Sequence, residues 1–332
     1  MLYNDSDLQK EALETFFSSK NIFITLTHYC NAFCQKCLTR YHKFRNQSIT
    51  YEMLNCISDF IIKHDYNGTI NIGSGEALTY KYLGDFVNKI LTKNRNTKFR
   101  ILTNGILLNK NLDNYYFDKR ITWGVTFDGF TNDDLTDLQS GVDIEIVKKN
   151  ISDLCQAGYN ENIYLNYTLN KQNFKSLKEF IDFASKNNVR ELYVTEMKIF
   201  CGFEKLEKFR FDSSKSSELF ELEKYAKSLN FYKVYFATLF SSKPFDKCYN
   251  VEHVYPIIDI DGSLSFCYGQ EDKILGNVFD NETIVKWYKL YLSLKDHTDA
   301  GKKWCTNCST KYDGSPYLKV PLDVYTYLKN EN

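Results

Sequence analysis

Over the first 200 residues, short apolar runs rich in β-branched and aromatic side chains alternate with longer segments of helical pattern. Runs of the first kind, bounded by polar residues, are typical of strands, whereas apolar residues at helical spacing predict helices. Strands are expected at residues 21–27, 68–73, 98–104, 121–127, 162–169 and 191–197. Helices are expected at residues 6–17, 80–93, 144–157 and 174–186.

These segments form six β-then-α units, an order that places the strands in parallel with helical crossovers between them. The expected fold is therefore α/β, either a partial (β/α)6 barrel of the TIM type or a doubly wound sheet. In both architectures, functional residues lie just beyond the carboxyl ends of the strands.

The pattern changes beyond residue 200. Residues 205–229 are charged and helix-prone, residues 231–239 have a strand pattern, and short strand-like runs with clustered cysteines follow. We therefore expect a helical leader at 1–20, the α/β core at 21–200, a bridging segment at 201–244, a smaller α+β domain at 245–320 and a tail at 321–332.

The charge balance and the cysteine content narrow the function classes. Lysine and arginine total 42, as do aspartate and glutamate, so no global field favours nucleic acid or an anionic membrane. The polar start MLYNDSDLQK lacks the apolar core of a signal peptide, and no run approaches the ~20 apolar residues of a membrane span. A cytoplasmic protein is expected, in which 10 cysteines are better explained as metal ligands, catalytic groups or core residues than as disulfides.

The stretch THYCNAFCQKCLTR places Cys30, Cys34 and Cys37 just after the first expected strand. Three thiolates from one loop can hold a [4Fe–4S] cube and leave one iron open to a small molecule. A closed zinc site, with His28 or a distant cysteine as fourth ligand, fits the same spacing. The spacing alone leaves both interpretations open.

Other motifs favour the cluster. The C-x3-C-x2-C spacing resembles the signature of the radical S-adenosylmethionine (SAM) superfamily, and GSGEA at 73–77 is similar to that family's GGEP motif. LTNG at 102–105 and TFDG at 126–129 follow the third and fourth strands and are similar to its ribose- and carboxylate-contacting segments. The resemblance implies a partial barrel with a [4Fe–4S] cluster on the three cysteines. It also implies a set of SAM-binding residues: Gly73, Ser74, Gly75, Glu76, Thr103, Asn104, Thr126 and Asp128.

The resemblance implies a reaction as well. Thiolates are soft ligands for iron, and the open iron would take the amino and carboxylate groups of SAM, with Glu76 beside the amino group. One electron from the reduced cluster then splits the S–C5′ bond and yields a 5′-deoxyadenosyl radical, which abstracts hydrogen from an unactivated C–H bond. The protein orients the radical and excludes water. An external one-electron reductant such as flavodoxin or ferredoxin is the expected partner.

Several positions depart from the family pattern. Lys36 stands where an aromatic residue usually lies beside the adenine, Ser74 replaces a glycine and Ala77 replaces the proline. The arginine that many relatives carry after TFDG is missing, and Gln139 is the substitute that the sequence offers for binding the SAM carboxylate. None of these changes removes a cluster ligand.

A second set of cysteines lies in the C-terminal part: Cys248, Cys267, Cys305 and Cys308. The first two flank Gly262 at spacings similar to the C-x(9–15)-G-x4-C opening of SPASM and twitch extensions. The resemblance implies a twitch-type Fe–S domain with a second, auxiliary [4Fe–4S] cluster, which would transfer electrons because it has no open iron. A zinc ribbon is the alternative. Gly262 fits the tight turn of DIDGSL with either metal.

Three other cysteines have separate interpretations. Cys56 and Cys155 fall in helical apolar patterns and are expected in the core. Cys201 follows the sixth strand, where a thiol could donate hydrogen to a substrate radical, as an epimerase needs, and a buried loop cysteine is the alternative. Glu196 and Lys198 flank the same strand end and could bind substrate.

With the resemblance, which covers roughly residues 20–312, these features predict a radical SAM enzyme. Its expected substrate is a ribosomally synthesised peptide, modified by epimerisation or crosslinking, because about 45 residues between barrel and extension could build a long cleft. The chain shows no peptide-recognition domain before the first cysteine motif, which weakens that interpretation. The alternatives are a dehydrogenase or epimerase acting on a small molecule such as a sugar or aminocyclitol, and a non-catalytic metal-binding or electron-transfer protein.

Overall fold

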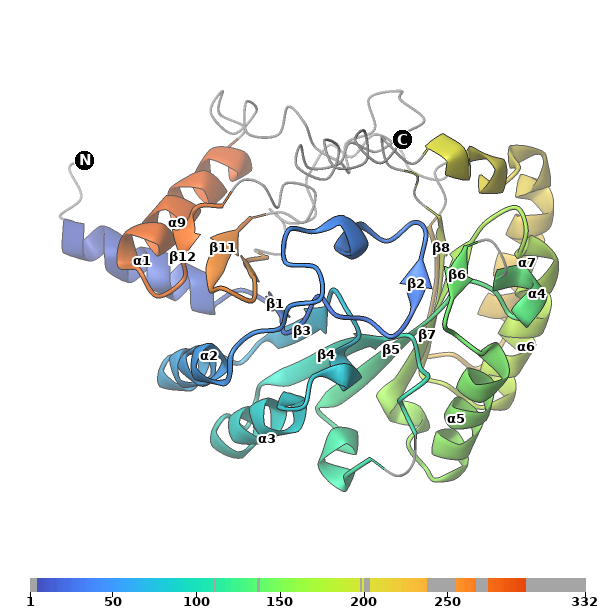
Figure 1. Cartoon of the computed structure of the whole chain (residues 1–332), viewed down its shortest axis with the longest axis horizontal. Helices are drawn as coiled ribbons and strands as arrows, with labels where there is room; N and C mark the ends of the chain where they lie inside the picture. Colours follow the sequence, from blue (N-terminus) through green and yellow to red (C-terminus); the bar gives the residue numbers. More distant parts are fainter. Residues whose placement is uncertain are drawn as a thin grey trace.

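One ten-stranded sheet organises the residues that this computed structural model describes, which are 5–109, 112–135, 138–197, 199, 204–237, 255–266 and 274–296 (Figure 1). From one edge to the other, its strands are β12 (Gly276–Asn277), β11 (Ser263–Ser265), β10 (Ile257–Ile258), β1 (Asn21–Thr25), β3 (Thr69–Gly73), β4 (Lys98–Thr103), β5 (Ile121–Phe127), β7 (Ile163–Leu169), β8 (Glu191–Glu196) and β9 (Lys233–Ala237). Neighbouring strands from β10 to β9 pair in parallel.

Helices cover the outer side of the curved sheet, and the chain between β1 and α2 crosses its inner side (Figure 1). The α-helices are α1 (Asp5–Phe17), α2 (Tyr51–Lys63), α3 (Leu83–Lys93), α4 (Asn132–Leu135), α5 (Ile144–Gln156), α6 (Leu177–Lys186), α7 (Ser216–Lys227) and α9 (Asn281–Lys295). Alternate strand residues are apolar and fully buried, as Ile22 and Ile24 are in β1 and Ile70 and Ile72 are in β3. The core therefore lies between the sheet and its helices.

Short polar side chains fix where the long helices begin. Thr50 accepts a hydrogen bond from Met53 N before α2, and Asp143 accepts one from Glu145 N before α5. Such caps satisfy amide groups that have no partner inside the helix. None of the helices in the described ranges is long and apolar enough to cross a membrane.

The partial barrel expected from the sequence is confirmed. The six expected strands are present as β1, β3, β4, β5, β7 and β8, and they follow one another across the sheet in chain order. The strand pattern at 231–239 forms β9, which extends the parallel series beyond the expected barrel. A small antiparallel pair, β2 (Phe33–Cys34) with β6 (Gln139–Ser140), stands apart from the main sheet.

The expectation that Cys56 lies in the core is wrong. Cys56 is exposed on α2, because that helix turns Leu54, Ile57 and Ile61 towards the sheet and leaves the position between them in solvent. Cys155, on α5, is partly buried and packs against the core.

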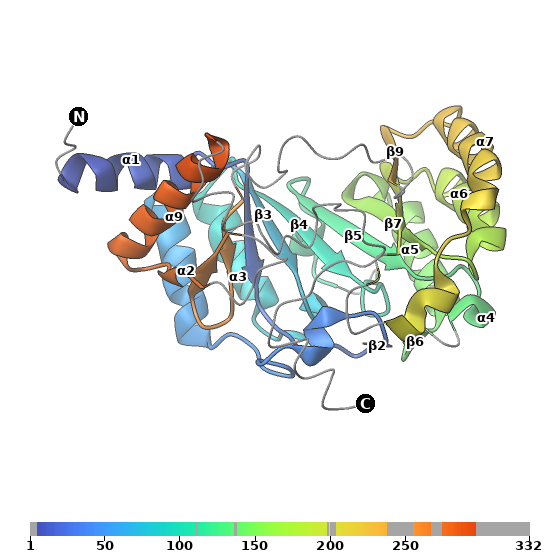
Figure 2. The ribbon, with the colours of Figure 1, turned by 90° about the horizontal axis from the view of Figure 1, so that it is seen from above.

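The described part of the predicted C-terminal domain continues the main sheet. β10 pairs in parallel with β1, with Phe23 opposite Ile257, and β11 and β12 follow in antiparallel order. Figure 2 shows α9 beside α1 at this end of the sheet, where the ring centroids of Phe16 and Trp287 lie 5.2 Å apart. The expected domain limits at 245 and 320 lie outside the described residues and stay predictions.

Candidate functional site

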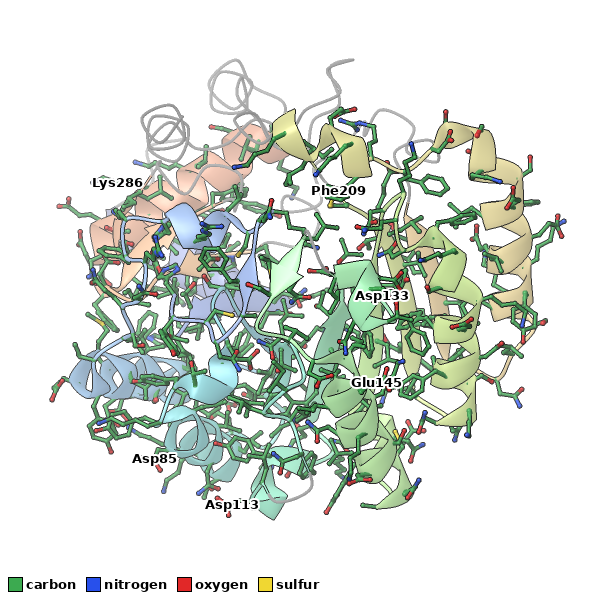
Figure 3. The ribbon with its side chains drawn as sticks, turned by 45° about the vertical axis from the view of Figure 1, so that its right-hand side comes forward. Asp85, Asp113, Asp133, Glu145, Phe209 and Lys286 are labelled. Atoms are coloured by element: carbon green, nitrogen blue, oxygen red, sulfur yellow. The ribbon has the colours of Figure 1, made fainter. Side chains whose placement is uncertain are left out.

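The three cysteines of the first motif lie on one loop that follows β1. Cys34 belongs to β2 and pairs with Gln139 of β6, and Gln35 N donates to Leu138 O at 2.9 Å. Cys37 N donates to Cys34 O at 3.2 Å, which folds the two residues into a tight turn. Figure 3 shows β2 and β6 side by side next to α4, which carries Asp133. The segment from Thr27 to Cys37, here called the cysteine loop, is thus fixed by backbone bonds at its far end.

The GSGEA turn fixes the near end of the cysteine loop. Gly75 N donates to Thr27 O at 2.9 Å, and Glu76 N donates to Tyr29 O at 2.8 Å. A Cβ atom at Gly75 would lie 2.1 Å from Tyr29 O, so only glycine allows this approach. The residue before Cys30 is therefore held directly against the second motif.

Glu76 joins the second motif to the third. Its carboxylate is buried and accepts hydrogen bonds from Thr103 Oγ1 at 2.8 Å, Asn104 N at 2.8 Å and Leu78 N at 3.2 Å. Burial raises the pKa of Glu76, and the donors from Asn104, Thr103 and Leu78 oppose that rise. In this structure Glu76 anchors the loops around the cysteines, and its expected contact with SAM stays a prediction.

Asn104 brings the third motif to the first cysteine. Its side-chain amide donates to Asn31 Oδ1 at 2.7 Å and lies 3.9 Å from Cys30 Sγ, and Ala32 N lies 3.4 Å from the same sulfur. The structure thus places Cys30, Glu76, Thr103 and Asn104 together, from three consecutive strand ends. Gly73, at the end of β3, approaches the ring of Phe23 so closely that a Cβ would lie 2.8 Å from it.

Burial favours the protonated form of the Cys30 and Cys34 thiols in the metal-free chain. Burial raises the pKa of Cys30 to about 11, against a weaker opposing hydrogen bond from Ala32. Burial also raises the pKa of Cys34, and the negative charge of Asp128 adds to that rise. Metal binding favours the thiolate instead, because a positive ion replaces the proton on the sulfur. Three sulfur donors on one loop fit an iron–sulfur cluster, since soft thiolates are its usual protein ligands.

Asp128 reaches the cysteine loop through Lys36. The carboxylate of Asp128 is 4% exposed and accepts a hydrogen bond from Lys36 Nζ, whose side chain is 18% exposed. Asn173 Nδ2 donates to the Asp128 carbonyl at 2.8 Å, which fixes the backbone of the fourth motif. Lys36, one of the residues that depart from the family pattern, therefore ties the first motif to the fourth by a buried ion pair.

Replacing Lys36 by methionine is expected to lower the free energy of unfolding by about 2–3 kcal/mol, because it leaves the Asp128 carboxylate buried without its cation. The double variant with Asp128→Asn should recover most of that loss, since it removes the buried charge as well. Urea unfolding of the wild type, the two single variants and the double variant measures both effects. Additive losses would contradict the pairing.

A row of polar and aromatic side chains crosses the inner face of the sheet. Thr126, Asn166, Tyr193 and Tyr235 pair in register from β5 to β9. Each is at least partly exposed, whereas the residues before them in the strands are apolar and mostly buried. Thr195 Oγ1 donates to Asn166 Oδ1 at 3.3 Å. This row, here called the inner row, offers hydrogen-bonding groups on the face that the cysteine loop crosses.

The remaining predicted residues divide into two groups. Gly262 takes a left-handed φ of +79° in a turn closed by its N–H to Asp259 O, which confirms the expected tight turn, and Glu196 is buried at the end of β8. Gln139 lies opposite Cys34, and its contact with the SAM carboxylate stays a prediction. The other predicted site residues lie outside the described residues: Lys198, Cys201, Cys248, Cys267, Cys305 and Cys308.

A buried polar cluster of His28, His42 and Asp259 was not expected from the sequence. His28 and His42 stack with their ring centroids 4.2 Å apart, and His28 Nε2 lies 2.8 Å from Asp259 Oδ1. His28 and Asp259 are 231 positions apart in the sequence, and no local pattern connects them.

Fold and site together define an α/β barrel protein with a cysteine-rich loop at the carboxyl end of its first strand. Residues 24–184 match the Radical SAM superfamily. This part of the chain is therefore identified as a radical SAM domain. The superfamily supports a [4Fe–4S] cluster and SAM as cofactors.

Solved structures share the fold. SuiB of Streptococcus suis bound to S-adenosylmethionine is 20% identical over 81% of this chain and 65% of SuiB, with a TM-score of 0.61. SuiB bound to precursor peptide SuiA is 18% identical over 87% of this chain and 71% of SuiB, with a TM-score of 0.62. Native anSMEcpe with bound AdoMet and Cp18Cys peptide is 15% identical over 94% of this chain and 95% of anSMEcpe, with a TM-score of 0.59. In the first of these matches, this chain spans less than two thirds of the length of SuiB. The search of curated protein sequences found no match to this chain.

Proposed function

We propose that this enzyme cleaves SAM reductively at a cluster held by Cys30, Cys34 and Cys37 and abstracts hydrogen from a C–H bond of a ribosomally synthesised peptide. The observation that carries the proposal is the fixed cysteine loop, in which backbone bonds from Gly75 and Glu76 hold the chain beside Cys30. When bound, the reduced cluster supplies the electron that splits SAM.

The chain's own residues prepare this site. The cysteine loop offers three sulfur ligands and leaves one iron for SAM. The buried Glu76 carboxylate and Asn104 hold the second and third strand ends against the loop, which fixes the ligands before the cofactors bind. Gly73, Ser74, Thr126 and Gln139 are proposed to contact SAM.

The inner row favours a peptide as the substrate. Its four side chains come from four adjacent strands, so the row is about 14 Å long, the length of about four extended residues. Hydrogen-bonding groups spread over that length suit a chain of amides better than a single ring. SuiB with SuiA and anSMEcpe with a peptide, which share this fold, support the same substrate class.

The C-terminal cysteines complete the proposal. Cys248, Cys267, Cys305 and Cys308 are proposed to hold an auxiliary [4Fe–4S] cluster, which would accept the electron when a substrate radical is oxidised during crosslinking. Cys201 is the proposed hydrogen donor for epimerisation. Flavodoxin or ferredoxin is the proposed source of the electron for SAM cleavage.

Anaerobic reconstitution tests the proposal. The full chain should bind about eight irons with matching sulfide and should release 5′-deoxyadenosine and methionine from SAM under dithionite. A short peptide encoded beside the gene should then lose two hydrogens if it is crosslinked, or gain one deuterium from D2O if it is epimerised. Bound zinc without sulfide, or intact SAM, would show that the proposed chemistry is wrong.

A further inference from the structure

Two histidines and an aspartate from separate parts of the chain form a buried group beside the cysteine loop. His28 and His42 are 6% and 8% exposed, and they stack with an angle of 17° between their planes. Asp259, which follows β10, places Oδ1 2.8 Å from His28 Nε2 and Oδ2 3.8 Å from His42 Nε2. No role in SAM binding or cluster assembly follows from the sequence motifs for this group.

The geometry excludes a shared metal ion. An imidazole binds a metal along a nitrogen lone pair in the plane of its ring, and two nearly parallel stacked rings cannot both point at one ion. Hydrogen bonds explain the arrangement instead. An ionised carboxylate only accepts, so His28 Nε2 carries the proton that it donates to Asp259. His42 Nδ1 accepts from Phe44 N at 3.3 Å, which leaves the proton of His42 on Nε2, the nitrogen nearer Asp259.

Ser74 connects this group to the GSGEA turn. Its hydroxyl donates to His28 Nδ1 at 2.9 Å and lies 3.2 Å from Thr39 Oγ1, which can donate to it in turn. Ser74 has a φ of +82°, a left-handed conformation that costs a residue with a side chain about 1–2 kcal/mol. A strained serine at a position where the family pattern has glycine is explained by these two bonds, which glycine could not make.

The bonds converge at the junction of the cysteine loop and the GSGEA turn. His28 stands between Thr27 and Tyr29, the two residues whose carbonyls accept from Gly75 N and Glu76 N. On the other side Asp259 is held by its turn, since its Oδ1 accepts from Ile260 N at 2.8 Å. Between the two sides lies a cavity of about 20 Å³, room for a single water, lined by serine and threonine side chains and by Ile257 and Ile274. The hydrogen bonds from Asp259 through His28 to Ser74 therefore connect the two sides directly.

We propose that Asp259 is a positioning residue for SAM binding, which acts through His28 and Ser74 on the cysteine loop and the GSGEA turn. The C-terminal strands would thereby hold the first motif in the shape that receives the cofactor. This inference rests on the proposed function. It adds a role for Asp259 and His28, neither of which is proposed to bind iron or SAM.

The test compares Asp259→Asn and Ser74→Ala with wild type in the full, anaerobically reconstituted chain. In Asp259→Asn, the side-chain amide would place a donor opposite the N–H of one of the two histidines, so that hydrogen bond is lost. Ser74→Ala removes the hydroxyl that bonds His28 Nδ1 and leaves β10 intact. Asp259→Asn should keep its iron and its kcat for SAM cleavage, and it should bind SAM about tenfold more weakly, a difference of about 1.4 kcal/mol. Ser74→Ala, at a residue proposed to contact SAM, tests the hydroxyl bridge by the hydrogen exchange of the loop alone. Asp261→Asn is the matched control, because Asp261 is exposed on the same turn and bonds only Ser263 N there among the described side-chain contacts.

Hydrogen exchange of the metal-free chain gives a second readout that does not depend on the cofactors. Residues 27–47 should exchange faster in Asp259→Asn and Ser74→Ala than in wild type and in the Asp261→Asn control. SAM affinity of Asp259→Asn and exchange of both variants within twofold of wild type would overturn the inference. If wild type itself binds no iron, the proposed function fails, and the exchange comparison still decides whether Asp259 positions the loop.

Discussion

Replacing Cys34 by serine is expected to reduce SAM cleavage by a thousandfold or more, about 4 kcal/mol in the barrier. A hydroxyl is a poor ligand for iron, and the cysteine loop would keep only Cys30 and Cys37 for the cluster. Release of 5′-deoxyadenosine under dithionite measures the loss. Iron should fall by about four atoms per chain, since the proposed auxiliary cluster uses other cysteines.

The control is Cys56→Ser, on the exposed side of α2 and away from the loop. It should keep both iron and activity. The fold should survive in the Cys34 variant too, because Cys34 pairs with Gln139 through its backbone and not through its sulfur. Full activity in Cys34→Ser would remove this residue from the proposed ligands.

Replacing Glu76 by alanine is expected to lower the free energy of unfolding by about 3 kcal/mol and to abolish measurable SAM binding. The change leaves the Thr103 hydroxyl and the amides of Leu78 and Asn104 without the acceptor that they share in a buried place. Urea unfolding of the metal-free chain measures the first effect, and equilibrium dialysis with SAM measures the second.

Glu76→Gln separates the two effects. Glutamine keeps one acceptor oxygen but turns an amide donor towards another donor, so an intermediate loss of stability is expected. Glu52→Ala is the control, because Glu52 is exposed in the first turn of α2. If Glu76→Ala unfolds at the same urea concentration as wild type, the anchoring role derived from its hydrogen bonds is wrong.

The parallel sheet and the position of the first cysteine motif after its first strand could be predicted, because both depend on local patterns in the sequence. A buried parallel strand such as Ile121–Phe127 needs a continuous run of β-rich residues, and each run is visible in the sequence without its partners. The carboxyl ends of such strands meet at one edge of the sheet. The sequence placed the motifs of Cys30, Glu76 and Asn104 after three such strands, and the structure brings these residues together.

The polar contacts between motifs could not be predicted. Lys36 and Asp128 are 92 positions apart, and a lysine and an aspartate at that separation occur in nearly every chain of this size. The hydrogen bond that Glu76 accepts from Asn104 N depends on a buried geometry that a sequence does not display. The sequence showed short strand-like runs in this part of the chain, but β10 has only two residues and nothing in them indicated that it would pair with β1.

The pairing of β10 with β1 has a consequence for how the chain folds during synthesis. β1 is among the first strands to leave the ribosome, but one of its edges gains its partner only after the strands up to β9 have been made. Until then that edge carries open amide and carbonyl groups, which can pair with another nascent chain. Completion of the sheet must also wait for a contact between distant parts of the chain, which slows folding. Early folding of residues 21–196 alone would therefore leave a product prone to aggregation, and a chaperone that shields β1 should raise the yield of folded protein.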